Sequence, residues 1–175
     1  MDTFKEIIVK ENHDQVDYGL EDVNFDSLSD GEYDMLAVQK KGGVIRNYPM
    51  IPGIDLSGTI VQTTDNRYTE GQKVIVTVFA MGMSHTGGFA EYARVSGDWI
   101  VPLPVNLSLK DSMVFGTAGF TAALSIMALE EKGMDLNNNP RILVTGSTGG
   151  VGSIALQILS KIGYKNIAAL VRKEQ

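Results

Sequence analysis

The sequence predicts a mixed α/β protein, with a β-rich first part and a single strand–helix–strand unit near its end. Short runs of β-branched and aromatic residues, separated by turn formers, occupy the chain up to Pro104. A stretch rich in Ala, Leu and Met follows with helical spacing, and then a glycine-rich loop joins an apolar strand to an amphipathic helix. Each of these elements is justified in turn below.

Composition excludes several classes of protein. The 175 residues are 43% hydrophobic and include no Cys, which excludes a disulfide scaffold, a thiolate zinc site and a cysteine nucleophile. The net charge is −6, and residues 1–34 hold 11 acidic against 2 basic residues, so we expect no nucleic-acid partner. We find no apolar run of about 20 residues and no signal peptide, so a cytoplasmic protein with no membrane contact is expected.

The first part reads as a small barrel or sandwich, because short strands recur between turn signals. The acidic first segment is expected to be a solvated face or edge of it. Turn formers such as Asp65-Asn66 and Gly87-Gly88 bound the runs. The expected strands are Phe4–Lys10, Gly58–Thr63, Lys73–Phe79, Phe89–Val95 and Trp99–Val101.

Helical signals begin after Pro104. Ser108 has the side chain of a helix N-cap, and Thr117–Lys132 places Phe120, Leu124, Met127 and Ala128 at helical spacing. Gly133 is a plausible C-terminal cap, and residues 135–140 form a linker.

A parallel strand pair closes the chain. The expected strands are Arg141–Thr145 and Asn166–Val171, and the helix between them ends at Gly163. This helix carries a stripe of apolar residues on one face: Val151, Ile154, Ala155, Ile158, Leu159 and Ile162.

The loop between the first of these strands and the helix is suited to a dinucleotide. A diphosphate needs backbone N–H groups at a helix N-terminus and no side chains in the way, and glycines provide both. The flanking strands and helix are the context that this motif requires, although a purely structural turn remains the alternative. The candidate cofactor-binding residues are Gly146, Ser147, Thr148, Gly149, Gly150, Val151, Gly152 and Ser153.

The end of the second strand favours NADPH over NADH. An acidic residue there would bond the ribose 2′-hydroxyl, whereas a basic residue accommodates the 2′-phosphate. The strand runs into Arg172 and Lys173 and carries no acid at its tip. A solvated basic pair is the alternative reading.

No metal site is expected. Zinc needs several Cys, His or carboxylate ligands, and the chain has only His13 and His85, far apart in sequence. His85 is read either as a hydrogen-bonding loop residue or as a residue that lines a substrate pocket.

Four motifs in order resemble the medium-chain dehydrogenase/reductase superfamily, in its zinc-free quinone oxidoreductase branch. A longer match, Ile45–Asp55 with Gly97-Asp98-Trp99, is similar to the acrylyl-CoA reductase group within it. Where zinc-dependent relatives carry a histidine ligand and a glutamate, this chain has Ile54 and Asp55. The four motifs are Pro52–Gly58, Gly87–Tyr92, Gly116–Ala122 and the glycine loop.

The resemblance implies a GroES-like N-terminal domain over residues 1–115, a connecting helix and linker over 116–140, and a partial NADPH-binding Rossmann domain over 141–175. It implies reduction of a carbon–carbon double bond conjugated to a carbonyl or thioester, by hydride transfer from NADPH without metal. The acceptor would be an enoyl-CoA, an enone or a quinone, and a homodimer is one option, since relatives are commonly dimers.

The resemblance also suggests roles for individual side chains. Thr117 and Thr121 resemble residues that line the nicotinamide side, with a helix cap and an ordinary helix-face Thr as alternatives. Arg46 could face an anionic substrate group such as a CoA phosphate, or be a plain surface arginine. In relatives a loop contributes a tyrosine to the substrate pocket. Tyr33 is the candidate remnant of that catalytic-pocket tyrosine.

The chain departs from the family in two places. Roughly ten residues, a strand and a loop, are expected to be absent near residues 32–33. The chain also ends soon after the second Rossmann strand, so a truncated reductase is expected. A catalytically inactive fragment that acts only as a binding or interaction module is therefore the competing hypothesis.

Overall fold

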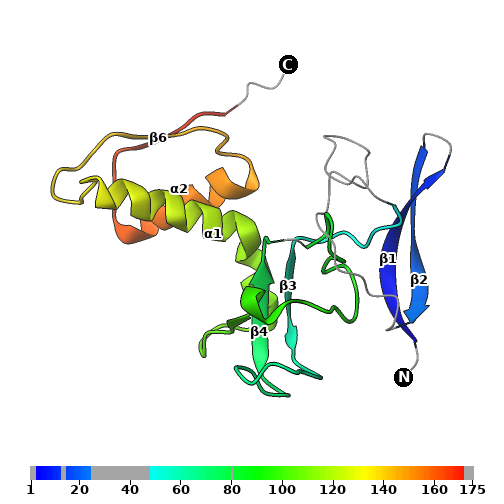
Figure 1. Ribbon diagram of the computed structural model, residues 1–175. Helices are drawn as coiled ribbons and strands as arrows, with labels where there is room; N and C mark the ends of the chain where they lie inside the picture. Colours follow the sequence, from blue (N-terminus) through cyan, green and yellow to red (C-terminus); the bar gives the residue numbers. More distant parts are fainter. Residues whose placement is uncertain (1–2, 13–14, 25–47, 80, 172–175) are drawn as a thin grey trace. The chain divides into compact units, whose positions relative to one another are not determined.

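The computed structural model describes residues 3–12, 15–24, 48–79 and 81–171 (Figure 1). They fall into two compact units, residues 1–113 and residues 114–175. The fold is mixed α/β, as the sequence predicted: the first unit is built of strands, and the second contains a parallel strand pair with its helix. The predictions that concern Tyr33, Arg46, Arg172 and the missing strand near 32–33 fall outside the described residues.

The first unit opens with a long antiparallel hairpin. Strands β1 (Thr3–Asn12) and β2 (Gln15–Asn24) pair along their whole length. Ion pairs cross the hairpin from Lys5 to Asp22 at 3.1 Å and from Lys10 to Glu21 at 2.6 Å. The acidic segment is thus partly a strand edge whose carboxylates lie against the lysines of its neighbour.

A second sheet of this unit contains β3 (Asp55–Thr59), β4 (Lys73–Thr77) and β5 (Val101–Pro102), in that order and antiparallel. All residues of β4 after Lys73 are β-branched, and their burial alternates: Val74 and Val76 are buried while their neighbours are less so. Backbone bonds tie β1 to the rest of the unit, since Val9 donates to the Met50 carbonyl at 2.9 Å.

The predicted strand Phe89–Val95 is wrong, and the predicted strand Trp99–Val101 is right only at Val101, where β5 begins. Residues 89–95 form no strand: Ala90 makes a single bridge with Glu6, and no ladder continues from it. Trp99 ends a short 3₁₀ helix, η2 (Gly97–Trp99), which Ser96 caps by accepting a hydrogen bond from the Asp98 N–H at 3.3 Å. A strand needs a neighbour to pair with, and β propensity alone does not supply one.

The second unit begins within α1 (Leu109–Glu131), a helix that kinks at Gly116, where φ is 47° and ψ is −154°. The helix starts as predicted, because the Asp111 N–H donates to the Ser108 hydroxyl at 3.0 Å. It ends as predicted at Gly133, whose φ is +96°. By length and composition α1 could cross a membrane. However, the part after the kink, residues 117–131, is shorter than the ~20 residues that a span needs.

The last elements are β6 (Ile142–Val144), α2 (Gly150–Ile162) and β7 (Ile167–Ala169). β6 and β7 are parallel, with Leu143 opposite Ala168, as the sequence predicted. Gly163 ends α2 in the left-handed conformation, with φ of 119°. The core of this unit is formed by Ile126, Leu159 and Tyr164.

The helix predicted over Thr117–Lys132 is present, but the large residues at helical spacing are not the ones that it buries. Phe120, Leu124 and Met127 are about half exposed, whereas Ala122 and Ile126 are buried. The helix is apolar on nearly every side, so its periodicity does not reveal which side faces the core.

Candidate functional site

The loop between β6 and α2 turns sharply at Gly146. This glycine has φ of +58°, a conformation that costs other residues strain, and its carbonyl accepts the N–H of Gly149 at 2.9 Å. The turn lies within residues 145–149, which connect the end of β6 to the start of α2. It is the strand–loop–helix geometry that the sequence predicted.

Gly152 lets the helix approach the loop closely. A Cβ at this position would collide with the carbonyl of Gly146, and the residue is buried. At Gly150 the nearest neighbour of such a Cβ is the side chain of Ala118, at 3.4 Å, which is ordinary contact. Packing therefore requires a glycine at position 152 but not at position 150.

Ser147 fixes the loop to the end of β7. Its hydroxyl donates to the carbonyl of Leu170 at 2.8 Å, and the residue is buried. Thr148, by contrast, is exposed. Ser153 is half-buried, and its N–H is bound by the carbonyl of Gly149 at 2.9 Å. Ser147 is therefore a structural member of the loop.

The N-terminus of α2 is open. Gly149 is the N-cap and has no side chain to accept the first N–H groups of the helix. In the described part of the chain, the N–H groups of Gly150, Val151 and Gly152 have no hydrogen-bond acceptor. Such groups at the positive end of a helix dipole bind anions, and a phosphate fits this donor set.

The other predicted cofactor residues lie on α1. Thr117 and Thr121 lie either side of Ala118, whose side chain faces Gly150, so this part of α1 adjoins the start of α2. Thr117 is half-buried and Thr121 is exposed. The Thr121 hydroxyl donates to the Thr117 carbonyl at 2.8 Å, a bond within the helix.

His85 belongs to the first unit, whereas the glycine loop belongs to the second. It is buried, its Nδ1 lies 2.9 Å from the Thr86 carbonyl oxygen, and its ring meets Trp99 edge-on at 4.9 Å. Trp99 in turn stacks on Phe79. These contacts match the loop hydrogen-bonding alternative for His85. Within the described ranges, no three His, Asp or Glu side chains gather where they could hold a metal ion.

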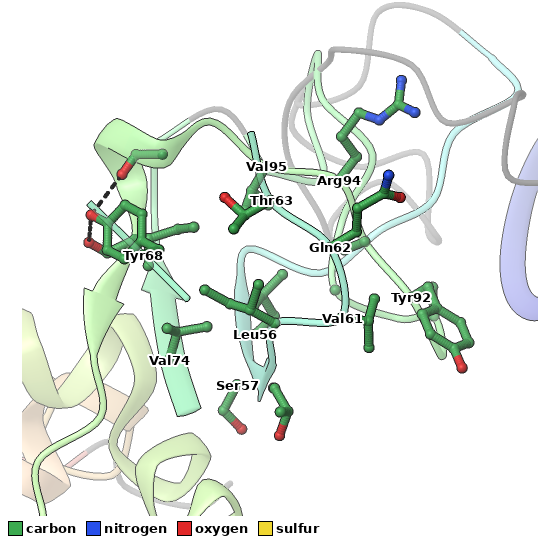
Figure 2. A pocket seen from close by; sticks show the side chains of 18 of the residues that line it. Leu56, Ser57, Val61, Gln62, Thr63, Tyr68, Val74, Tyr92, Arg94 and Val95 are labelled. Atoms are coloured by element: carbon green, nitrogen blue, oxygen red, sulfur yellow. Dashed lines mark hydrogen bonds between the residues drawn. The ribbon is translucent and has the colours of Figure 1, made fainter. Parts of the chain in front are cut away.

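The first unit contains a cleft that the sequence did not predict. It is a cleft of about 1110 Å³ between β3 with the residues that follow it and residues 88–95 (Figure 2). Leu56, Val74 and Met113 are among its apolar lining residues.

Comparison with known proteins gives a consistent picture. Residues 25–105 match the family model of the alcohol dehydrogenase GroES-like domain. The chain is 52% identical over 141 residues to YhfP of Bacillus subtilis (strain 168), a candidate quinone oxidoreductase. It is 46% identical over 141 residues to the acrylyl-CoA reductase AcuI of Ruegeria pomeroyi. Each match covers 81% of this chain and 42% of the relative.

Solved structures agree with these matches. The yhdH oxidoreductase of Salmonella enterica, solved in complex with NADP, superposes with a TM-score of 0.90 at 39% identity, covering 97% of this chain and 56% of that one. YhfP of Bacillus subtilis, solved with NAD bound, superposes with a TM-score of 0.86 at 42% identity, covering 97% and 54%. The chain therefore spans about half the length of the relatives that it matches.

Proposed function

This chain belongs to the medium-chain dehydrogenase/reductase superfamily, among quinone oxidoreductases and acrylyl-CoA reductases, and from that premise we propose that it binds NADPH at residues 146–153. The proposed reaction is metal-free hydride transfer to an activated carbon–carbon double bond of an enoyl thioester, enone or quinone. The observation that carries the proposal is the open N-terminus of α2, with three N–H groups that no residue of the described chain accepts.

In this proposal the residues of the loop bind and orient the cofactor. The N–H groups of Gly150, Val151 and Gly152 hold the diphosphate, and Ser147 holds the loop against the end of β7. Arg172 then follows that strand and would meet a 2′-phosphate, which favours NADPH over NADH. When bound, the nicotinamide supplies the hydride.

The substrate side is proposed by resemblance. Thr117 and Thr121 would line the nicotinamide side, because the intervening Ala118 adjoins the start of α2. Arg46 would face an anionic group of the substrate, and Tyr33 would stand near the reacting carbonyl as a hydrogen-bond donor. The buried position of His85 favours a structural role for it over contact with substrate.

A substitution at the N-cap of α2 separates an effect on NADPH affinity from an effect on the stability of the fold. Gly149 has extended φ and ψ, which Asp and Asn adopt readily. The Gly149→Asp side chain would cap α2 and place a negative charge where the diphosphate binds. We expect NADPH affinity, followed by cofactor fluorescence, to fall at least tenfold. The free energy of unfolding should change by less than about 1 kcal/mol, because the new cap offsets a Cβ placed 3.3 Å from the Gly146 carbonyl oxygen.

Gly149→Asn is the matched control, since it caps the helix without a charge, and we expect it to weaken NADPH binding less. Wild-type protein should bind NADPH more tightly than NADH. Equal NADPH affinity in wild type and Gly149→Asp would refute the loop as the diphosphate site.

The second candidate function is a binding module without catalysis, which the cleft in the first unit favours. Turnover separates the two candidates. The reductase proposal predicts oxidation of NADPH in the presence of acrylyl-CoA or a quinone above the background rate. Saturable NADPH binding with no turnover on either acceptor would favour the module.

A further inference from the structure

We propose that Ser147 is a positioning residue that sets the preference of this chain for NADPH over NADH. It does so by holding the end of β7 at a fixed place relative to the open N-terminus of α2. The inference rests on the proposed function, because it concerns the same cofactor site. It adds to that function the side chain on which the choice between the two cofactors depends.

The two cofactors differ only at one end of the site. Their diphosphate is the same, and in both it binds the N–H groups at the start of α2. The 2′-phosphate belongs to NADPH alone, and in a strand–loop–helix–strand unit that ribose lies beside the end of the second strand. Here the second strand is β7, and Arg172 follows Leu170 by two positions in the sequence. The preference therefore depends on how the end of β7 is held relative to α2.

Backbone pairing does not hold the end of β7. The ladder between β6 and β7 ends where Val144 lies opposite Ala169. One further backbone bond follows it, from the Leu170 N–H to the Val144 carbonyl at 2.9 Å. Among the described residues, no other backbone hydrogen bond involves Leu170 or Val171. Another contact must therefore fix this end of the strand.

Ser147 supplies that contact, and it touches α2 as well. Its hydroxyl donates to the Leu170 carbonyl at 2.8 Å. Its Cα packs against the first turn of α2, since a Cβ at Gly152 would lie only 2.8 Å from it. Ser147 is buried, so water does not readily replace its acceptor and the bond persists. One residue thus joins the start of α2 to the end of β7, and all three belong to one compact unit.

Loss of the hydroxyl should affect the two cofactors unequally. Ser147→Ala frees the end of β7 but leaves the N–H groups of α2 in place. Charge-assisted bonds to a phosphate depend on distance and direction, and NADH has no 2′-phosphate to lose them. We expect the affinity for NADPH to fall at least about fivefold and that for NADH to stay within about twofold of wild type.

The test uses the full 175-residue chain and titrates each variant with NADPH and with NADH, followed by cofactor fluorescence. Ser147→Thr retains the hydroxyl and should keep the wild-type ratio of the two affinities within about twofold. Ser147→Cys keeps the shape of serine but donates weakly, so its ratio should fall as in Ser147→Ala. Ser160→Ala is the matched control, because it removes an exposed hydroxyl of α2 and should change neither affinity.

A second measurement does not depend on a variant. In ¹H–¹⁵N spectra of the wild type, the amide of Val171 should shift more with NADPH than with NADH, because only NADPH brings a phosphate to the end of β7. Equal shifts of this amide with the two cofactors would contradict the proposal.

Failure of the inference can be told from failure of the proposed function. If the wild type binds neither cofactor, both are overturned. If the wild type binds NADPH and NADH equally, or if Ser147→Ala keeps the wild-type ratio, only the role of Ser147 is overturned. A loss of both affinities by the same factor would show that Ser147 stabilises the whole loop and does not select the cofactor.

Discussion

Two glycines at the start of α2 differ in whether the packing leaves room for a side chain. Gly152 is buried, and a side chain there would meet the backbone of Gly146. Gly150 is exposed and has room for a methyl group beside Ala118. Sequence pattern alone treats these glycines as equivalent, whereas the packing of the helix on its own loop distinguishes them.

This difference predicts opposite effects on stability. Gly152→Ala should lower the free energy of unfolding by about 2 kcal/mol, because backbone atoms that cannot move aside occupy the place of the methyl group. Gly150→Ala should leave it unchanged or raise it by up to about 1 kcal/mol, since Ala favours a helix over Gly. Urea denaturation of both variants checks this, and equal losses would contradict the packing account.

The surroundings of Glu6 change the pKa of its carboxyl group. It is buried in β1, opposite Glu21 across the hairpin, and its Oε2 has no hydrogen-bond partner in the described structure. Burial, together with the negative charge of Glu21, raises the pKa of Glu6 to about 7. The folded chain therefore holds a proton there that the unfolded chain releases near pH 4.5.

Stability should then fall as the pH rises. Above pH 4.5 the unfolded chain loses this proton first, so folding is progressively disfavoured until the folded form also ionises near pH 7. Between pH 5 and pH 8 we expect the wild type to lose on the order of 1–2 kcal/mol more than Glu6→Gln, which cannot ionise. Parallel pH profiles of the two proteins in urea denaturation would exclude this role for Glu6.

At the scale of elements, the sequence predicted correctly those features that depend on residues close together in the chain. The caps at Ser108, Gly133 and Gly163 and the strand–loop–helix–strand order depend on neighbouring residues, and the structure has them. The failures concern pairing and burial. β2 was not predicted, although apolar residues alternate at Val16, Tyr18 and Leu20, because its acidic residues obscured the pattern.

The candidate site follows the same division. The glycine loop could be predicted from residues 141–171, because strand, turn and helix are contiguous in sequence. The adjacency of Ala118 to Gly150 and the bond from Ser147 to Leu170 could not, since each joins positions that only tertiary packing brings together. The cleft in the first unit likewise arises from two segments far apart in the chain.

At the scale of the whole molecule, large apolar side chains are exposed in the second unit. Leu143 in β6 is 63% exposed and Leu170 after β7 is 56% exposed, and Phe120, Leu124 and Met127 of α1 add to them. Strands of a parallel sheet are normally covered on both faces. Apolar surface of this kind promotes association.

We therefore expect the chain to self-associate as its concentration rises. Sedimentation velocity between ~5 and ~100 µM should show an increasing weight-average mass. Leu143→Lys, which places a charge on this apolar surface, should lower the tendency, whereas Lys161→Arg, a change on α2 that keeps the charge, should not. A concentration-independent monomer would contradict the expectation.

The most direct test of the account is a ¹H–¹⁵N NMR titration of the chain with NADPH. If the diphosphate binds the open N-terminus of α2, the amide resonances of Gly150, Val151 and Gly152 shift saturably and by more than those of the first unit. The account is contradicted if these three amides stay in place while others move, or if no amide shifts at millimolar NADPH.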